Sequence, residues 1–482
     1  MIGFRPVGYI IGWLILGLGG LMIVPFLVDL AHGDPNARAF AVAAILAMLI
    51  GAATAVACAE DRRVTLSLRQ GFLLTAGSWA IFPAFAGLPL MLGAPHLGFT
   101  DAYFEFTSAL TTTGSTVIVG LDQLPQGALL WRCMVTWVGG IGVILLAMIL
   151  LPVLNIGGMQ MLKSADFNTL GKIMPEARSI ALSIGSVYVV LTLACTLAYL
   201  WAGMPGFDAV AHGFSTVATG GMANRDNSFA DFSPAVQWIA TVFMLLGAMS
   251  FSRFVQFARG EPKALFQDSQ IRAFLTIYLC LAAGLLAARL LASAPLSVGT
   301  VREVLFSLAS VITTTGFAAT DYSLWGPFAE TIFFCAMMIC GCSGSTSGGP
   351  KVFRYQLLLG AVHGEVRRLH SPSTVFTPRF QGVAVTDEVM DSVIAFFMLF
   401  FLTLGLGAVA LVLLELDPVS AISGAAASLT NVGPGLGPVL GPAGTYAPLP
   451  DAAKWVCSFL MLVGRLEIMT AYVLFTVAFW RG

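Results

Sequence analysis

Long apolar runs recur along the whole chain and indicate its architecture. A helix needs about 20 apolar residues to cross the hydrocarbon of a bilayer, and each of these runs is of that order. Polar and charged positions gather between the runs rather than alternating within them. The pattern predicts ten membrane spans: Val7–Leu30, Ala39–Ala59, Gly71–Leu92, Leu129–Leu154, Ile180–Ala202, Val236–Phe257, Ala273–Ala292, a run beginning at Trp325, Val389–Leu414 and Ala452–Trp480.

Four shorter apolar segments lie between these spans, and each is followed by a polar tetrad. Segments of about 10 to 13 residues are too short to cross a bilayer alone and have the length of re-entrant helices. They are Ala102–Thr111, Phe207–Ala218, Val301–Thr313 and Val419–Thr430. The tetrads read TTTG, ATGG, TTTG and TNVG, and they end at Gly114, Gly221, Gly316 and Gly433.

The same order of elements occurs four times once the first two spans are set aside. Each unit has a long helix, a short helix, a tetrad and a second long helix, and such repeated units are usually incomplete alone. We predict an all-α polytopic membrane protein, with two N-terminal transmembrane helices and four helix–pore-loop–helix repeats in a pseudo-fourfold arrangement. The expected boundaries are 1–66 for the N-terminal pair and 67–170, 171–265, 266–380 and 381–482 for the repeats.

The composition agrees with a membrane protein and excludes other classes. Of the 482 residues, 57% are hydrophobic and only 10% are charged, whereas a soluble domain carries about 25% charge. A net charge of −1 argues against a nucleic-acid partner, which requires a basic face. The cysteines are scattered through apolar stretches, and no cluster of acids, histidines or nucleophiles suggests an enzyme. The first run has no small-residue cleavage site and is expected to stay as a span.

Basic residues predict the orientation in the membrane, because cytoplasmic loops carry an excess of Lys and Arg. All four basic loops fall on one side if every predicted span crosses once, and the opposite loops carry acids and few bases. Both termini are therefore expected in the cytoplasm, with the short segments entering from outside. The basic residues are Arg62, Arg63 and Arg69; Lys163, Lys172 and Arg178; Arg253, Arg259, Lys263 and Arg272; and Lys351, Arg354, Arg367, Arg368 and Arg379.

The tetrads are candidates for an ion-selectivity filter. Irregular backbone at membrane depth is tolerated only where it lines a cavity or is buried in protein. A short helix entering from outside points its partially negative C-terminal end at the membrane centre, and an extended Thr/Gly stretch then offers carbonyl oxygens that can replace an ion's water. One tetrad alone would be read as a turn with a glycine cap. Four tetrads in equivalent places favour a filter.

The residue types of the tetrads indicate which ion would pass. None contains the carboxylates of a divalent-cation pore or the bases of an anion pore, so a monovalent cation is expected, K⁺ before Na⁺. Glycine can adopt positive φ, which turns successive carbonyls toward the ion. We predict K⁺ binding, as the transported ion, at the last three positions of each tetrad: Thr112, Thr113 and Gly114; Thr219, Gly220 and Gly221; Thr314, Thr315 and Gly316; and Asn431, Val432 and Gly433.

Motifs outside the tetrads carry a resemblance to a known family. They are WVGGIGVILLAMILLPVLNIGGMQ, CGCSGSTSGGPKVFRYQLL, TNVGPGLGPV and GRLEI. With the four repeats, they resemble the Trk/Ktr/HKT superfamily of potassium transporters over essentially the whole chain. The extra N-terminal pair makes the chain most similar to the bacterial TrkH-type subunit. The resemblance implies K⁺-channel-like units, in which a glycine ending all four tetrads goes with K⁺ preference. The ATGG tetrad, with Gly220 in third place, departs from TTTG.

The apolar run from Trp325 to about Gly360 is too long for one straight helix, and GCSGSTSGGP lies in its middle. We expect a broken helix with this segment beneath the filter. A loop leading to a cytoplasmic helix is the alternative, and a phosphate loop is excluded because GxxxxGK[ST] is missing. The resemblance implies a gating loop at Gly341, Ser343, Gly344, Ser345, Thr346, Ser347, Gly348 and Gly349.

Arg465 lies in the middle of the last predicted span, where a charge should face a wet cavity or a partner. One interpretation places it in the pore below the filter, as a barrier to cations, and the resembling family has a similar arginine. The other pairs it with an acid on another helix. Glu467 is not the obvious partner, since i,i+2 residues do not share a helix face. His212 and Glu105, in short segments, either support the filter or are hydrogen-bonded packing residues.

The expected partners follow mostly from the resemblance. The chain has no GxGxxG after a strand and no Walker motif, so no nucleotide site of its own is expected. The resemblance implies a homodimer in the bacterial inner membrane and a cytoplasmic nucleotide-binding RCK/TrkA-type regulatory subunit. Arg354–Arg379 is a candidate docking surface. Two mechanisms stay open: a gated K⁺ channel or permease, and a symporter coupled to H⁺ or Na⁺. The lack of a midplane carboxylate favours the first.

Overall fold

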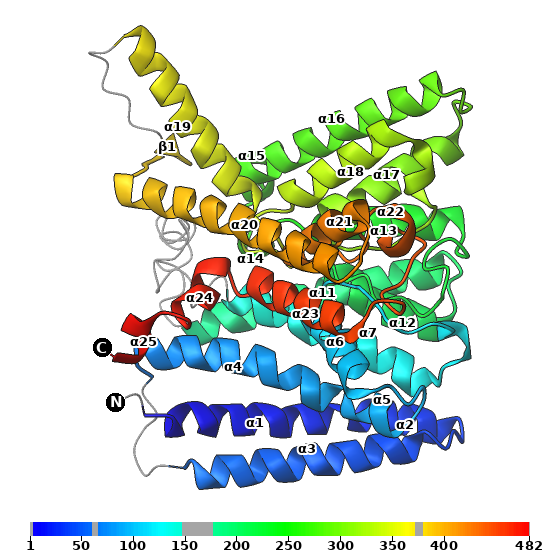
Figure 1. Ribbon diagram of the computed structural model, residues 1–482. Coiled ribbons are helices and arrows are strands. Elements are labelled where there is room, and N and C mark those ends of the chain that lie inside the picture. The colour runs from blue at the N-terminus through cyan, green and yellow to red at the C-terminus, as the bar shows by residue number, and fades with distance from the viewer. Residues whose placement is uncertain (1–2, 60–65, 147–176, 372–378, 482) are drawn as a thin grey trace.

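The computed structural model describes residues 3–59, 66–146, 177–371 and 379–481, and this part of the chain is almost entirely helical (Figure 1). The only strands among these residues are β1 (Arg379–Phe380) and β2 (Val383–Ala384), an antiparallel pair. The two chain ends lie at the same end of the molecule, on the left in Figure 1. Seven described helices are long and apolar enough to cross a membrane, or eight if one bent pair is a single span.

The N-terminal helices lie against the first repeat. In the first repeat, a short helix and the irregular segment after it connect two long helices. The predicted span Leu129–Leu154 can be followed only to Leu146, and Arg62, Arg63, Lys163 and Lys172 lie outside the described residues. The elements are α1 (Arg5–Leu21), α2 (Ile23–Ala31), α3 (Ala37–Ala57), α4 (Leu68–Ala86), α5 (Leu88–Leu92), α6 (Phe99–Leu110), the 3-10 turn Leu121–Gln123 and α7 (Gln126–Leu145).

The other three repeats have the same order of elements. Their short helices are α12, α17 and α21, which correspond to α6 of the first repeat. The elements are α11 (Ala177–Trp201), α12 (Gly206–Val217), α13 (Pro234–Gly247), α14 (Phe251–Ala258) and α15 (Lys263–Gln267); α16 (Ser269–Leu291), α17 (Val298–Ile312), the 3-10 turn Tyr322–Trp325, α18 (Pro327–Ile339) and α19 (Val352–His370); and α20 (Asp387–Leu413), α21 (Pro418–Thr430), α22 (Gly437–Leu440), α23 (Asp451–Arg465), α24 (Ile468–Val473) and α25 (Val477–Arg481).

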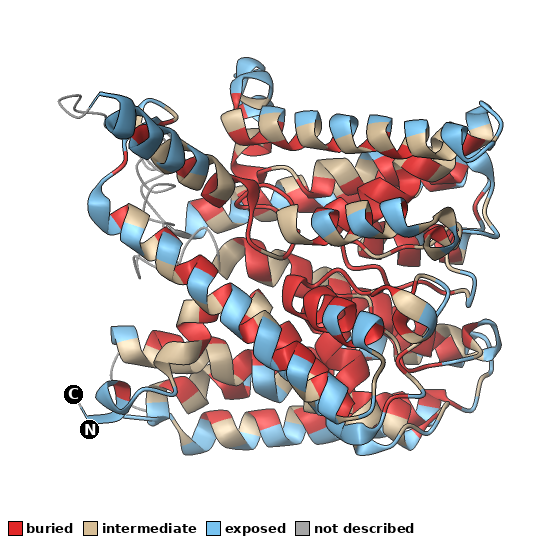
Figure 2. Ribbon diagram, turned by 45° about the horizontal axis from the view of Figure 1, so that its top comes forward, coloured by how far each residue is buried: buried red, intermediate tan, exposed pale blue. Residues whose placement is uncertain are grey.

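The short helices are the most enclosed part of the fold. Buried residues fill the centre of the molecule, and exposed ones lie along the outer helices (Figure 2). The exposed positions of α20 are largely apolar, among them Leu402, Leu406 and Val409. Such a surface would be costly in water and is suited to lipid. The four short helices and the segments after them therefore meet in the interior of a lipid-facing bundle.

The predicted span Val236–Phe257 is not one helix. The axes of α13 and α14 meet at 94°. The break leaves backbone groups without helical partners, and the segment Gly341–Gly349 of the third repeat, called here the Gly/Ser segment, bonds two of them. The Cys342 N–H donates to the Ala248 carbonyl, and the Phe251 N–H donates to the Gly344 carbonyl, each at 2.9 Å. The bend thus depends on partners far away in the sequence.

The predicted last span, Ala452–Trp480, is also broken. It divides into α23, α24 and α25, and α23 ends at Arg465. Glu467 has a φ of +65°, and its carboxylate forms an ion pair with Arg354, with Nη2 and Oε2 2.6 Å apart. Arg465 is therefore at a helix end rather than in the middle of a helix.

The apolar run that begins near Trp325 forms two helices, as predicted: α18 ends at Ile339, and α19 begins at Val352. The intervening Gly/Ser segment is buried, so it is not an exposed connector. Lys351 and Arg354 were predicted to lie in a basic cytoplasmic loop, but both are buried, at 8% and 0% exposure. Arg354 is therefore not part of any docking surface in this conformation.

Candidate functional site

The four tetrads share one backbone conformation. The residue in second position has positive φ in every copy: 53° at Thr112, 47° at Thr219, 58° at Thr314 and 57° at Asn431. The closing glycine is also left-handed, with φ of 86°, 68°, 88° and 100° in chain order. Left-handed residues turn the carbonyls of neighbouring peptides toward a common side, and three of the second positions hold a β-branched threonine, for which this region is costly.

Each tetrad is tied to its short helix in the same way. The N–H of the third residue donates to a carbonyl five residues earlier: Thr113 to Ser108, Gly220 to Ser215, Thr315 to Ser310, and Val432 to Ala427. The four N···O distances are 2.8, 2.9, 2.8 and 2.9 Å. The chain therefore leaves every helix at the same point, and the helix holds the left-handed residue in place.

The four tetrads close into a ring. A Cβ at Gly114 would lie 2.8 Å from the Gly220 carbonyl oxygen, and a Cβ at Gly221 would collide with that of Thr315. In the same order, a Cβ at Gly316 would collide with the Val432 carbonyl oxygen, and one at Gly433 with that of Thr113. Each closing glycine thus faces the third residue of the next repeat, and the fourth faces the first. This closed sequence of contacts makes the pseudo-fourfold axis a local feature of the site.

Hydrogen bonds between repeats hold the ring on the side of the fourth repeat. The Ser115 hydroxyl donates to the Gly433 carbonyl at 3.1 Å, and the Tyr446 hydroxyl donates to the same oxygen at 2.9 Å. The Asn431 amide donates to the Thr113 hydroxyl at 3.0 Å. Since the tetrads are buried, these bonds form away from bulk water and restrain the ring.

A buried ion pair supports the first repeat. Arg132 of α7 meets Glu105 of α6 at 2.7 Å, and it also donates to the Ala223 carbonyl, just after the second tetrad, at 2.9 Å. Glu105 further accepts from the Val117 N–H at 3.0 Å. Glu105 thus supports the segment that follows the first tetrad. The sequence reasoning passed over Arg132, although an arginine near the start of an apolar run was a usable signal.

His212 lies in α12 and is fully buried, and its ring accepts from the Asn224 N–H at 3.3 Å. The acids near the starts of the short helices have different roles. Asp101 pairs with Lys454 and Asp208 with Arg225. Asp417 caps α21 by accepting from the Ser420 N–H at 3.0 Å. Burial would raise the pKa of Asp417, but this bond and others from backbone and hydroxyl groups lower the pKa below its usual range.

The segment from Gly341 to Gly349 lies against the second positions of the ring. The Thr219 hydroxyl bonds the Thr346 hydroxyl at 3.0 Å, and the Thr314 hydroxyl bonds that of Ser347 at 3.2 Å. The Gly348 N–H donates to the Thr314 hydroxyl at 2.7 Å. A Cβ at Gly348 would collide with the Thr430 carbonyl, so the segment is seated directly against the backbone of the ring.

Arg465 contacts this segment rather than an acid. Its Nη2 donates to the Thr346 carbonyl at 2.7 Å, while its Nε and Nη1 have no partner in the described part of the chain. No ion pair to an acid is seen for it among those residues. The nearby carboxylate of Glu467 is taken by Arg354, whose guanidinium carbon lies 3.8 Å from the centre of the Phe396 ring.

The two sides of the ring differ in open space. On the side of the closing glycines, a cavity of about 100 Å³ touches all four of them. On the other side, the Gly/Ser segment, Arg465 and Glu467 line a cavity of only about 20 Å³. A site for one water needs about 10–15 Å³, so a hydrated ion does not fit there. The ring is thus open to one side and closed on the other.

Comparisons with known proteins agree with this architecture. A family model described as a cation transport protein, TrkH, matches residues 36–480. The Trk system potassium uptake protein TrkI of Halomonas elongata is 42% identical over 97% of this chain and 95% of its own. The Trk system potassium uptake protein TrkH of Salmonella typhimurium is 36% identical over 99% of both chains.

A solved structure is similar over the whole chain. The crystal structure of the potassium transporter TrkH from Vibrio parahaemolyticus aligns with a TM-score of 0.91 and 37% identity, covering 100% of both chains. These relatives are transport proteins and not enzymes. With its repeated short helices, its closed ring of tetrads and these full-length matches, the chain belongs to the TrkH family of membrane transport proteins.

Proposed function

We propose that this chain is a potassium uptake protein whose K⁺ path runs through the ring of four tetrads. The closed ring of glycine–carbonyl contacts is the observation that carries the proposal. It creates a narrow, carbonyl-rich passage without carboxylates, which suits a dehydrated monovalent cation. The relatives named as Trk system potassium uptake proteins support K⁺ as the ion.

The Gly/Ser segment is proposed as the gate. It is buried against Thr219 and Thr314 of the ring and leaves only the small cavity on that side. Conduction therefore requires the segment to move away from the ring. Arg465 places a positive charge at the same level, where it raises the energy of a passing cation.

The membrane location, the oligomeric state and the regulatory partner are proposed from the sequence and the relatives together. The protein is expected in a bacterial inner membrane as a homodimer, with both termini in the cytoplasm. The relatives belong to a named system, which supports a separate regulatory subunit, and a nucleotide-binding RCK/TrkA-type ring on the cytoplasmic side is the proposed form. Such a partner would supply the energy that displaces the gate.

Flux measurements on the purified chain in liposomes test the function. K⁺ and Rb⁺ should pass and Na⁺ and Li⁺ should pass poorly, because the carbonyl ring fits the larger ions. K⁺ uptake driven by a K⁺ gradient alone, at zero pH and Na⁺ gradients, would support a channel or permease. Uptake that needs one of the other gradients would instead establish the H⁺- or Na⁺-coupled symporter. Equal passage of all four ions would contradict the filter.

A further inference from the structure

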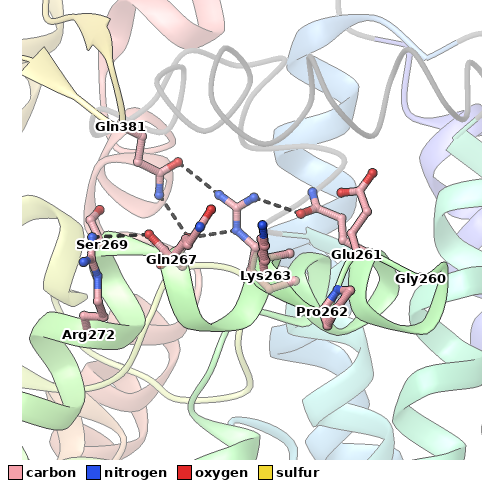
Figure 3. A pocket seen from close by; sticks show the side chains of 12 residues that line it. Gly260, Glu261, Pro262, Lys263, Gln267, Ser269, Arg272 and Gln381 are labelled. Atoms are coloured by element: carbon pink, nitrogen blue, oxygen red, sulfur yellow. Dashed lines mark hydrogen bonds and ion pairs between the residues drawn. The ribbon is translucent and has the colours of Figure 1, made fainter.

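A large cavity in the described structure lies apart from the proposed ion path. It has a volume of about 790 Å³ and lies between α14, α15, the start of α16 and the turn between β1 and β2 (Figure 3). Polar side chains line most of it. The cavity lies on the same side of the tetrad ring as the Gly/Ser segment, because the start of α14 bonds that segment directly.

The charges in this cavity, called here the α14–α16 cavity, do not cancel. Arg253 is neutralised by Asp268, with Nε and Oδ2 2.8 Å apart, and it also bonds the Gln381 side chain at 3.1 Å. The other lining bases are Lys263 and Arg272, against one further acid, Glu261. Lys263 has no ion pair in the described part of the chain, and Arg272 makes one long bond of 3.4 Å to a backbone carbonyl. One positive charge is left over.

Two further donors in the α14–α16 cavity lack acceptors. Gln256 is 2% exposed, and its amide nitrogen has no partner within the residues that the structure describes. The Ser269 hydroxyl is buried and unpartnered there as well. Buried donors are almost always satisfied, so a cavity that gathers several without acceptors indicates a missing group that accepts hydrogen bonds.

We propose that the α14–α16 cavity binds a phosphate-bearing anion, through Lys263, Arg272, Gln256 and Ser269. Phosphate oxygens accept several hydrogen bonds at once and complement a net positive site. A lipid headgroup is the favoured source, because Phe257 and Phe266, the chain neighbours of the lining residues Gln256 and Gln267, are 47% and 76% exposed. Basic residues next to exposed aromatic ones are typical of membrane interfaces with anionic lipids.

The site is connected to the Gly/Ser segment. Gln270, in the first turn of α16, accepts from the Ser343 N–H at 3.0 Å, and the Phe251 N–H at the start of α14 donates to the Gly344 carbonyl at 2.9 Å. An anion that bridges α14 and α16 would stabilise the two elements that hold this segment. This second step rests on the proposed function, since it assumes that the segment is the gate.

Thermal unfolding of the purified full chain tests the site. Phosphatidylglycerol in mixed micelles should raise the unfolding midpoint above the value in phosphatidylcholine, and Lys263→Gln/Arg272→Gln should need about tenfold more phosphatidylglycerol for the same rise. Arg259→Gln/Arg5→Gln removes the same charge from exposed positions outside the cavity and should respond as the unmodified chain does. Ser269→Ala should weaken the response without lowering the midpoint in phosphatidylcholine, because its hydroxyl has no partner among the residues that the structure describes.

A second arm identifies the source of the phosphate. Saturable stabilisation by inorganic phosphate, measured against chloride at equal ionic strength and lost in Lys263→Gln/Arg272→Gln, would assign the site to a free anion. Stabilisation by phosphatidylglycerol alone would assign it to the headgroup. Equal titration of the cavity variant and its charge control, or no stabilisation by either probe, would overturn the site.

K⁺ flux measurements distinguish the effect of the bound anion on the Gly/Ser segment from anion binding in the α14–α16 cavity itself. Phosphatidylglycerol should lower K⁺ flux in liposomes of the unmodified chain more than in the cavity variant. Variant-sensitive binding with no lipid effect on flux would overturn the coupling and leave the site standing. If a chain lacking part of Ser343–Gly349 carries no K⁺ either, the proposed function fails while the binding result is unaffected.

Discussion

Gly114 is the residue at which ion selectivity should be most sensitive. A serine there would have a φ of +86° and a Cβ 2.8 Å from the Gly220 carbonyl oxygen, so the ring must shift. We expect Gly114→Ser to reduce K⁺ over Na⁺ selectivity by about tenfold, which corresponds to roughly 1.4 kcal/mol. Reversal potentials in mixed K⁺/Na⁺ solutions would measure it. Gly203→Ser is the matched control, because Gly203 has a φ of +87° and no atom within 4 Å of the added Cβ.

Arg465 and Arg354 should behave oppositely when mutated. Arg465 has no acidic partner in the described residues, so Arg465→Ala leaves no buried carboxylate unpaired. It should fold and raise K⁺ flux roughly fivefold, if its charge adds about 1 kcal/mol to the barrier. Flux per folded protein in liposomes is the measurement. A loss of folded protein instead would show that Arg465 is mainly structural.

Arg354→Ala, by contrast, leaves Glu467 buried without its partner at 2.6 Å. Breaking a buried pair from one side costs about 3 to 5 kcal/mol, so the thermal unfolding midpoint in detergent should fall markedly. The double variant Arg354→Met/Glu467→Gln removes both charges and should recover much of the loss. If the single variant were as stable as the unmodified chain, the pair would not hold the broken helices together.

At single positions, the sequence indicated the glycines of the ring but not the left-handed threonines. Glycine is the expected residue for positive φ, so Gly114 could be assigned from its type. Thr112 and Thr314 are poor choices for that region, and they adopt it because the helix end and the neighbouring repeats determine their backbone. Their conformation comes from tertiary contacts, which a single sequence does not display.

At the scale of elements, hydroxyl groups of the ring help to hold the Gly/Ser segment, and their contacts can be tested one at a time. Thr314→Val removes the hydroxyl that accepts from the Gly348 N–H at 2.7 Å and bonds Ser347. Losing about 1 kcal/mol from the closed state should raise K⁺ flux without a regulatory partner by roughly fivefold. Thr112→Val is the control, since its hydroxyl has the equivalent place in the ring and no partner in the described structure.

Comparable flux in the two valine variants would mean that the change acts through the ring and not through the segment. Deleting part of Ser343–Gly349 should have a larger effect in the same direction. Unchanged flux after that deletion would make the segment a passive connector.

The elements themselves were predictable where local composition decides them. The four short helices lie where apolar segments too short to cross a membrane precede the tetrads, and the Gly/Ser segment lies at the break after α18. The 94° bend between α13 and α14 and the end of α23 at Arg465 were not predictable. Both breaks occur in stretches that are apolar by composition. The groups that bond the backbone or side chains at these breaks, the Gly344 carbonyl and the Arg354 guanidinium, come from another repeat.

At the scale of the whole molecule, the arrangement predicts on which side of the membrane each helix end lies. Both chain ends lie at one end of the bundle, and α3 ends there as well, whereas α16 ends at the opposite end (Figure 1). The basic loops favour the cytoplasm for the end with the termini. Ala59 and Ala292 are exposed residues just beyond α3 and α16, so they report on opposite sides.

Single cysteines at these two alanines should therefore react differently with a membrane-impermeant maleimide added to intact cells. In a chain with Cys58, Cys280 and Cys335 changed to serine, the other described cysteines are buried and should stay silent. We expect Ala292→Cys to be labelled and Ala59→Cys to be labelled only after the membrane is opened. The reverse pattern would invert the molecule, placing the closed side of the ring outside and making the Gly/Ser segment an external barrier, which a cytoplasmic regulatory subunit could not reach.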